Sequence, residues 1–151
     1  MKIIIVGAFA IGTHLAKLLS RDHDDITLID SDPERLAKIG NDFDLLTIEA
    51  SPTSVKALKQ AGAQDADLFL CDATYPDDAQ QAQAKQYGHS TFRQDAELAA
   101  RAGVRRLWLM HYSPIITDPE AARPAAEAAF PAVECGVDGQ QIILRYDEEP
   151  S

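Results

Sequence analysis

The sequence is poor in cysteine and in positive charge, and it lacks a long apolar run. Its two cysteines, Cys71 and Cys135, form no C-x-x-C pair, which predicts reduced thiols in a cytoplasmic setting. Lysine and arginine number 14 against 24 acidic residues, which gives a net charge of −10. Because nucleic acids and anionic membranes bind basic surfaces, neither is expected as a partner. No apolar run approaches the roughly 20 residues of a membrane-spanning helix, and the first residues lack the features of a signal peptide.

The sequence also lacks common catalytic signatures. It has no G-x-S-x-G turn of a serine hydrolase and no Walker A motif for nucleoside triphosphates. A nucleophilic cysteine needs a histidine as base and a third group that orients the histidine, and no such third group can be placed for Cys71. We therefore expect no catalytic residues and no enzymatic activity.

What the sequence does have is a regular alternation of predicted strands and helices. In the first half, strands are expected at 2–7, 25–30, 44–50 and 66–74, and helices at 11–20, 33–39 and 52–61. Ser31 or Asp32 is expected to cap the second of these helices, and Ser51 the third. This alternation predicts a single α/β domain over residues 1–151. Its expected form is a Rossmann-like three-layer α/β/α sandwich with a mostly parallel sheet of about six strands.

The second half continues the same pattern with a longer gap. The expected elements are a helix at 77–87, a helix at 92–102 behind a Thr91–Gln94 capping box, a strand at 105–112 and a last helix from Asp118 and Pro119. Pro124 falls inside that last helix, so a kink or a short helix is expected there. Residues 132–146 are expected to form a C-terminal hairpin around the turn signal Asp138-Gly139.

The stretch from Gly7 to Gly12 follows the first strand and opens the first helix, as the dinucleotide-binding fingerprint G-x-G-x-x-G does. The first glycine of that motif allows a tight turn and the third allows close packing of helix on strand. Phe9 stands at the second glycine, where the backbone would approach a pyrophosphate. Asp30 ends the second strand, where an acid would bind a ribose; the alternative makes it a turn former. The candidate nucleotide-binding residues are Gly7, Phe9, Ala10, Ile11, Gly12 and Asp30.

Three stretches, MKIIIVGAFAIGTHLAKLLS, DITLIDSDPERLAKI and GAQDADLFL, resemble the N-terminal domain of the TrkA potassium-uptake regulators, which is a nucleotide-binding domain of the RCK type. The resemblance covers residues 1 to about 70. It implies a Rossmann sheet that binds NAD(H) or an adenine nucleotide and gates potassium transport, with Gly7, Gly12 and Asp30 as nucleotide contacts. It also implies a homodimer, because such domains usually pair.

After Leu70 the sequence resembles another family. The boxes C-D-A-T (71–74), G-H-S-T (88–91) and M-H-Y-S (110–113) are similar, in order and spacing, to the C-terminal part of metallo-β-lactamase-fold hydrolases of the ribonuclease Z type. This second resemblance covers about 66–145. It implies that His111 matches a zinc ligand and that His89 matches the histidine that assists at the scissile phosphate. That family also needs an H-x-H-x-D-H motif, which the four histidines of this chain do not form.

The residues Asp72, His89 and His111 follow two neighbouring predicted strands and their loop, so they could gather at the carboxyl edge of the sheet. Because a zinc site needs three or four ligands and this set is incomplete, we expect vestigial positions and no bound metal. The plainer alternative makes His89 a helix-start residue and His111 a strand-end histidine.

The two resemblances lead to one main hypothesis: an engineered chimera of two α/β folds, fused near 66–72, with no evolved catalytic activity and no cofactor. The first alternative is an RCK-like regulatory module that binds NAD, ADP or AMP weakly at Gly7–Gly12. The second alternative is a residual metal-dependent hydrolase. Nucleotide binding would favour the regulatory module, and zinc in the purified protein would favour the hydrolase.

Overall fold

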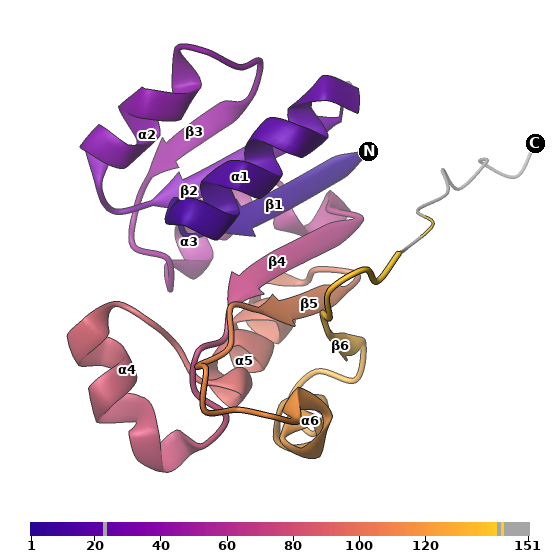
Figure 1. Ribbon diagram of the computed structural model, residues 1–151. Helices are drawn as coiled ribbons and strands as arrows, with labels where there is room; N and C mark the ends of the chain where they lie inside the picture. The colour runs from indigo at the N-terminus through magenta and orange to yellow at the C-terminus, as the bar shows by residue number, and fades with distance from the viewer. Residues whose placement is uncertain (23, 142, 144–151) are drawn as a thin grey trace, which may run out of the picture.

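The computed structural model describes residues 1–22, 24–141 and 143 (Figure 1). Its strands are β1 (Lys2–Val6), β2 (Asp25–Asp30), β3 (Leu46–Glu49), β4 (Leu68–Asp72), β5 (Leu107–Met110) and β6 (Val133–Cys135). Its α-helices are α1 (Ala10–Leu19), α2 (Pro33–Gly40), α3 (Val55–Gln60), α4 (Gln81–Tyr87), α5 (Phe92–Ala102) and α6 (Arg123–Glu127). Its 3₁₀ turns are η1 (Ser20–Asp22), η2 (Ala63–Asp65), η3 (Asp78–Gln80) and η4 (Pro119–Ala121). None of the helices in this described part has both the length and the apolar character needed to cross a bilayer.

The strands form one sheet in the order β3-β2-β1-β4-β5-β6, and all the neighbouring strands described are parallel. Helices α1 and α2 pack on one face, and α3, α5 and α6 pack on the other. The predicted Rossmann-like α/β fold is therefore confirmed. The central strand β1 explains why the fold forms, because its run Ile3–Val6 is buried on both faces of the sheet.

The strand order creates a switch point between β1 and β4. From β1 the chain builds outward through β2 and β3, and it then returns to place β4 on the other side of β1. The loops that leave β1 and β4 therefore diverge and open a crevice at the carboxyl ends of these strands, where open α/β sheets bind their ligands. Helix α4 stands beyond the arrowhead of β4, on this side of the molecule (Figure 1).

The start of the third predicted helix differs from the structure. Helix α3 begins at Val55 rather than near Pro52, because Ser54 and not Ser51 supplies the capping oxygen, at 3.2 Å from the backbone N of Ala57. Ser51 instead hydrogen-bonds with the hydroxyl of Thr53. At the second helix the open choice is resolved, because the Asp32 side chain accepts from the backbone N–H groups of Glu34 and Arg35.

The C-terminal region departs from the predicted hairpin. Strand β6 extends the sheet as a parallel neighbour of β5, and Asp138-Gly139 forms a turn after it, with Gly139 at φ +79°. The second arm of the hairpin falls on 140–146, of which 142 and 144–146 lie outside the described residues; the others are not in a strand. Pro124 lies in the first turn of α6, where its missing N–H costs no intrahelical bond. Of the two predicted outcomes, a kink or a short helix, the structure therefore has the short helix.

Candidate functional site

The turn between β1 and α1 has the geometry that its two glycines predict. Gly7 has φ +101°, in the left-handed region that favours glycine, and its N–H donates to the carbonyl of Ile29 at 2.9 Å. A Cβ on Gly12 would lie 1.9 Å from the carbonyl oxygen of Gly7, so only glycine lets α1 pack this closely on the turn. The two residues therefore perform the tight-turn and close-packing roles of the first and third fingerprint glycines.

The N-terminus of α1 is not capped by a side chain. Phe9 occupies the N-cap position in an extended conformation, and its ring offers no oxygen to the first N–H groups of the helix. The first intrahelical bond runs from Thr13 N to the carbonyl of Phe9. Free N–H groups and the positive end of the helix dipole make such a terminus a suitable place for a phosphate.

Asp30 is buried, and both of its carboxylate oxygens are engaged by the turn. The residue is only 1% exposed, and its two carboxylate oxygens accept from the backbone N–H of Ala8 at 2.6 Å and of Asp32 at 2.8 Å. Both oxygens thus hold the turn against the end of β2. This arrangement supports the alternative interpretation of Asp30 as a turn former over that of a ribose contact.

Phe9 and Arg35 form a stacked pair over the turn. The Arg35 guanidinium carbon lies 4.0 Å from the centroid of the Phe9 ring, and its nitrogens lie 3.6 Å from Asp30 and 3.2 Å from Asp32. The Phe9 ring also lies 6.0 Å from the imidazole of His89. The sequence analysis missed Arg35, although a cation in the first turn of a helix, three residues after the acidic cap, was a usable signal.

A cleft of about 600 Å³ opens at the switch point. Gly7, Phe9 and Asp30 from the predicted nucleotide set line it, together with Asp72 and His89 from the second half. The other predicted residues lie elsewhere: Gly12 is buried, Ala10 is exposed, and Ile11 lines a different pocket. The structure therefore brings members of both predicted groups of site residues to one cleft, while His111 lines the other pocket.

The second group is a cluster of Asp72, His89 and His111. The Nδ1 atoms of His89 and His111 lie 3.0 Å and 2.8 Å from the same oxygen, Oδ2 of Asp72. Because a carboxylate only accepts hydrogen bonds, each imidazole in this arrangement donates from Nδ1. The expectation that strands β4 and β5 bring these side chains together at the carboxyl edge is confirmed.

Neighbouring residues fix the cluster in place. The Thr74 hydroxyl lies 2.7 Å from Oδ1 of Asp72, and the Ser90 hydroxyl donates to the Asp72 carbonyl. His111 has φ +61°, and within the described residues it is the single non-glycine residue with a positive φ. A side chain in this conformation requires support from its surroundings, and such residues gather at functional sites.

Asp95 lies behind the cluster on the buried face of α5. Burial raises the pKa of its carboxyl well above the ordinary value, and the charge of Asp72 raises it further, against a hydrogen bond from Ser90 that lowers it. The Ser90 oxygen is 2.9 Å from Oδ2 of Asp95. The sequence analysis missed this residue, although an acid among the apolar positions Phe92, Ala96 and Ala99 of one helix face is unusual.

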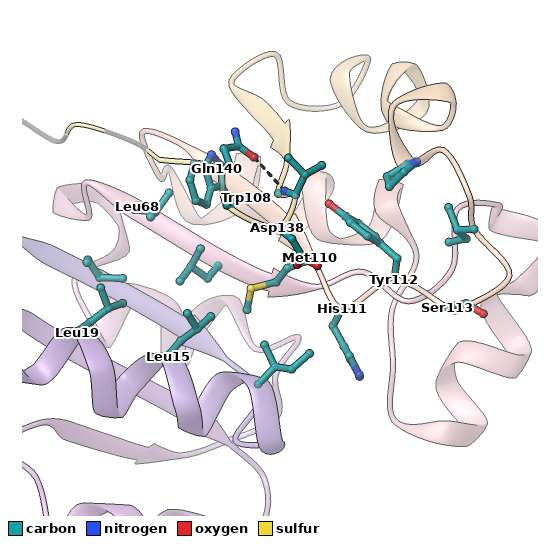
Figure 2. A pocket seen from close by; sticks show the side chains of 18 of the residues that line it. Leu15, Leu19, Leu68, Trp108, Met110, His111, Tyr112, Ser113, Asp138 and Gln140 are labelled. Carbon is teal, nitrogen blue, oxygen red and sulfur yellow. Dashed lines mark hydrogen bonds between the residues drawn. The ribbon is translucent and has the colours of Figure 1, made fainter.

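An apolar pocket of about 910 Å³ lies on the α1 side of the sheet, over β4 and β5. Figure 2 shows Leu15 and Leu19 of α1 on one side of it and Trp108 and Met110 of β5 on another. His111 stands at its edge, with its ring directed away from Trp108 and Met110. The pocket exists because α5 and α6 both cover the opposite face, so the outward-facing side chains of β5 remain partly exposed.

The parallel sheet, the glycine turn and the switch-point cleft together define a Rossmann-type α/β domain. A solved structure with the same fold is the NAD(P)-binding domain of an exopolyphosphatase-related protein from Archaeoglobus fulgidus. It has a TM-score of 0.59 and 15% identity, covering 88% of this chain and 86% of that one. The TrkA-N domain model matches residues 3–105, and the chain belongs to that family.

Curated relatives carry two different names. Trk system potassium uptake protein TrkA of Haemophilus influenzae is 39% identical over 99 residues, which is 66% of this chain and 21% of that protein. Ribonuclease Z of Lachnospira eligens is 41% identical over 87 residues, which is 58% of this chain and 29% of that protein. The chain thus spans less than a third of the length of either relative.

The family match corrects one boundary of the sequence analysis. The resemblance to TrkA was expected to end near Leu70, but the family model continues to residue 105, through β4 and α5. The aligned lengths of 99 and 87 residues together exceed the 151 residues of the chain, so the two relatives match overlapping parts of it. The two resemblances therefore do not divide cleanly at 66–72.

Proposed function

We propose that this chain is a nucleotide-binding regulatory module that holds the phosphates of NAD or an adenine nucleotide at the N-terminus of α1. The observation that carries the proposal is the Gly7–Gly12 turn, which sets an uncapped helix terminus at the switch point of a parallel sheet. Membership of the TrkA-N family supports the same ligand class. A regulatory role in potassium transport, without catalysis, rests on the name of the TrkA relatives and belongs to the proposal.

Two cations line the cleft and can reach a phosphate. They are Arg35 from α2, which is also paired with Asp30 and Asp32, and Lys85 from α4. A volume of about 600 Å³ lies within the range of small-molecule sites, about 300–1,000 Å³. With Asp30 committed to backbone N–H groups, the expected contribution of this chain is phosphate binding, with little recognition of the ribose.

Phe9 is the main departure from the fingerprint, and its removal is the direct test. Calorimetric titration of the whole chain with NAD⁺, NADH, ADP and AMP is expected to give saturable heat with at least one of them. The same ligand at 100 times its Kd is expected to raise the unfolding free energy by about 2.7 kcal/mol. Phe9→Gly opens the path of the phosphate and is expected to tighten binding about tenfold, or about 1.4 kcal/mol.

Phe43→Gly is the matched control, because Phe43 is also a partly buried ring under a cation, Lys17, but lies away from the cleft. Its affinity for the nucleotide is expected to equal that of the parent chain. Absence of heat and of any thermal shift at millimolar concentrations of all four nucleotides contradicts the proposal. Equal or weaker binding by Phe9→Gly contradicts the role given to the ring.

The engineered chimera remains a second hypothesis, about origin as well as function. It is supported by relatives of two names, each matching more than half of the chain. It predicts no nucleotide binding and no catalytic turnover, so the same titration separates it from the regulatory module. The third hypothesis, a metal-dependent hydrolase, is supported by the name of the ribonuclease Z relatives and predicts turnover of a phosphodiester that depends on added metal.

A further inference from the structure

We propose that Asp72, His89 and His111 form a binding site for a divalent transition-metal ion such as Zn²⁺. One carboxylate oxygen and two imidazole nitrogens are a common ligand set for this ion. In the described chain these ligand atoms all lie within 4.8 Å of one another. The site uses different atoms from the phosphate-binding turn, so the proposal does not depend on nucleotide binding.

The spacing of the three atoms is close to what the ion requires. Tetrahedral Zn²⁺ with nitrogen and oxygen ligands at about 2.0–2.1 Å holds neighbouring ligand atoms about 3.3 Å apart. The two nitrogen–oxygen distances are 3.0 and 2.8 Å, so each pair must separate by a few tenths of an ångström, and each imidazole must turn until its Nδ1 faces the ion instead of the Asp72 oxygen. A metal ligand nitrogen must be unprotonated. On binding, each imidazole must therefore present Nδ1 without a proton and carry its N–H on Nε2.

The surroundings hold the ligands in this arrangement before any ion arrives. Asp72 ends β4, His89 precedes α5 and His111 ends β5, so rigid elements position all three. The Thr74 hydroxyl donates to the second oxygen of Asp72, which limits rotation of the carboxylate, and Ser90 hydrogen-bonds to the backbone carbonyl of Asp72, which ties the loop before α5 to the end of β4. Partners of this kind, bonded to the ligands rather than to the ion, orient metal ligands and raise affinity. His111 also adopts a positive φ, a backbone conformation that a non-glycine residue keeps only with support from its surroundings.

The cluster is also accessible from solvent. The side chains of Asp72, His89 and His111 are 16%, 20% and 36% exposed, and the first two line the switch-point cleft. Three protein ligands then leave the fourth position of a tetrahedral ion to water or to a ligand in the cleft. The resemblance to ribonuclease Z gave a ligand role to His111 alone, whereas the geometry adds Asp72 and His89 and needs no H-x-H-x-D-H motif.

The test is metal binding by the whole chain after treatment with a chelator, without nucleotide. Zn²⁺ is titrated calorimetrically, and Co²⁺ is followed by its visible absorption, which reports the number and type of ligands. We expect one ion per chain for both metals. His89→Gln and His111→Gln are each expected to weaken binding at least ~100-fold, and the double variant is expected to abolish it. His14→Gln is the matched control, because His14 is an exposed histidine on α1 and lies outside the cluster.

Circular dichroism and thermal unfolding establish that each variant is folded. If a single variant fails to fold, X-ray absorption of the Zn²⁺-loaded parent chain decides instead, because the site requires two imidazole nitrogens in the first coordination shell. Failure of both metals to bind at millimolar concentration overturns the proposal and leaves a cluster of hydrogen bonds. So does binding that His14→Gln weakens as much as the cluster variants do, or an absorption spectrum without imidazole ligands.

Discussion

Asp30 and Asp72 occupy equivalent places in the two halves of the molecule, yet they have opposite surroundings. Each is the last residue of a parallel strand at the same edge of the sheet. Asp30 is buried and bonds to backbone N–H groups, whereas Asp72 is partly exposed and bonds to the side chains of Thr74, His89 and His111. An acid whose partners are backbone groups builds the turn, and one whose partners are titratable side chains is available to a ligand.

The largest expected effect is the difference in unfolding free energy lost when each of these two acids is replaced by alanine. Asp30→Ala leaves the N–H groups of Ala8 and Asp32 without their carboxylate and is expected to lower the unfolding free energy by about 3–4 kcal/mol. Asp72→Ala is expected to cost about 1–2 kcal/mol, because its partners are side chains that can turn toward water. Urea unfolding followed by circular dichroism measures both.

Asp30→Asn and Asp72→Asn keep the side-chain shape and serve as controls for packing. They are expected to preserve the order of the two alanine variants with smaller losses. An equal loss for the two alanine variants contradicts the comparison, because it would mean that the Asp72 cluster is as much a part of the folded core as the turn.

The next effect concerns close packing in the first half. Gly12→Ala places a Cβ where only 1.9 Å separates it from the Gly7 carbonyl oxygen, so α1 must shift away from the turn. We expect a loss of about 2–3 kcal/mol in the unfolding free energy and loss of nucleotide binding. Gly40→Ala is the control, because Gly40 lies in α2 and its Cβ would come no closer than 3.4 Å to the side chain of Thr47 in β3. This variant is expected to be neutral or slightly stabilised. Similar losses in both variants would show that the tight approach of α1 does not matter.

The same contrast explains what could be predicted from the sequence. Strand and helix positions followed from apolar runs, capping residues and glycines, and the Thr91–Gln94 capping box forms as expected. These signals are local, so a single sequence carries them. The role of Asp30 depends on which groups its oxygens bind. Those groups come within reach only when β1 and β2 lie side by side.

The candidate site was predictable only as far as topology determines it. Parallel strands bring their carboxyl ends together, so the meeting of Asp72 and His111 followed from the order of elements. The shared oxygen of the cluster and the stacking of Arg35 on Phe9 depend on side-chain rotamers and on the loop before α5. Neither has a signature in residue spacing.

The smallest expected effect, about 1–2 kcal/mol, concerns Asp95, the buried acid behind the cluster. Burial raises its pKa above the value of about 3.9 that it has in the unfolded chain, so the folded state binds the proton more tightly. This contribution to stability is complete below pH 4 and is lost as pH rises through the raised pKa. The Asp95→Asn variant carries no titrating group at this position, so its unfolding free energy does not fall in this way. The difference in unfolding free energy, variant minus parent, is therefore expected to increase by about 1–2 kcal/mol from pH 5 to pH 8. Urea unfolding at several pH values measures the difference, with the exposed Asp44→Asn as a control for the loss of one negative charge. A difference that is constant with pH would mean that burial does not raise the pKa of Asp95, and it would contradict the prediction.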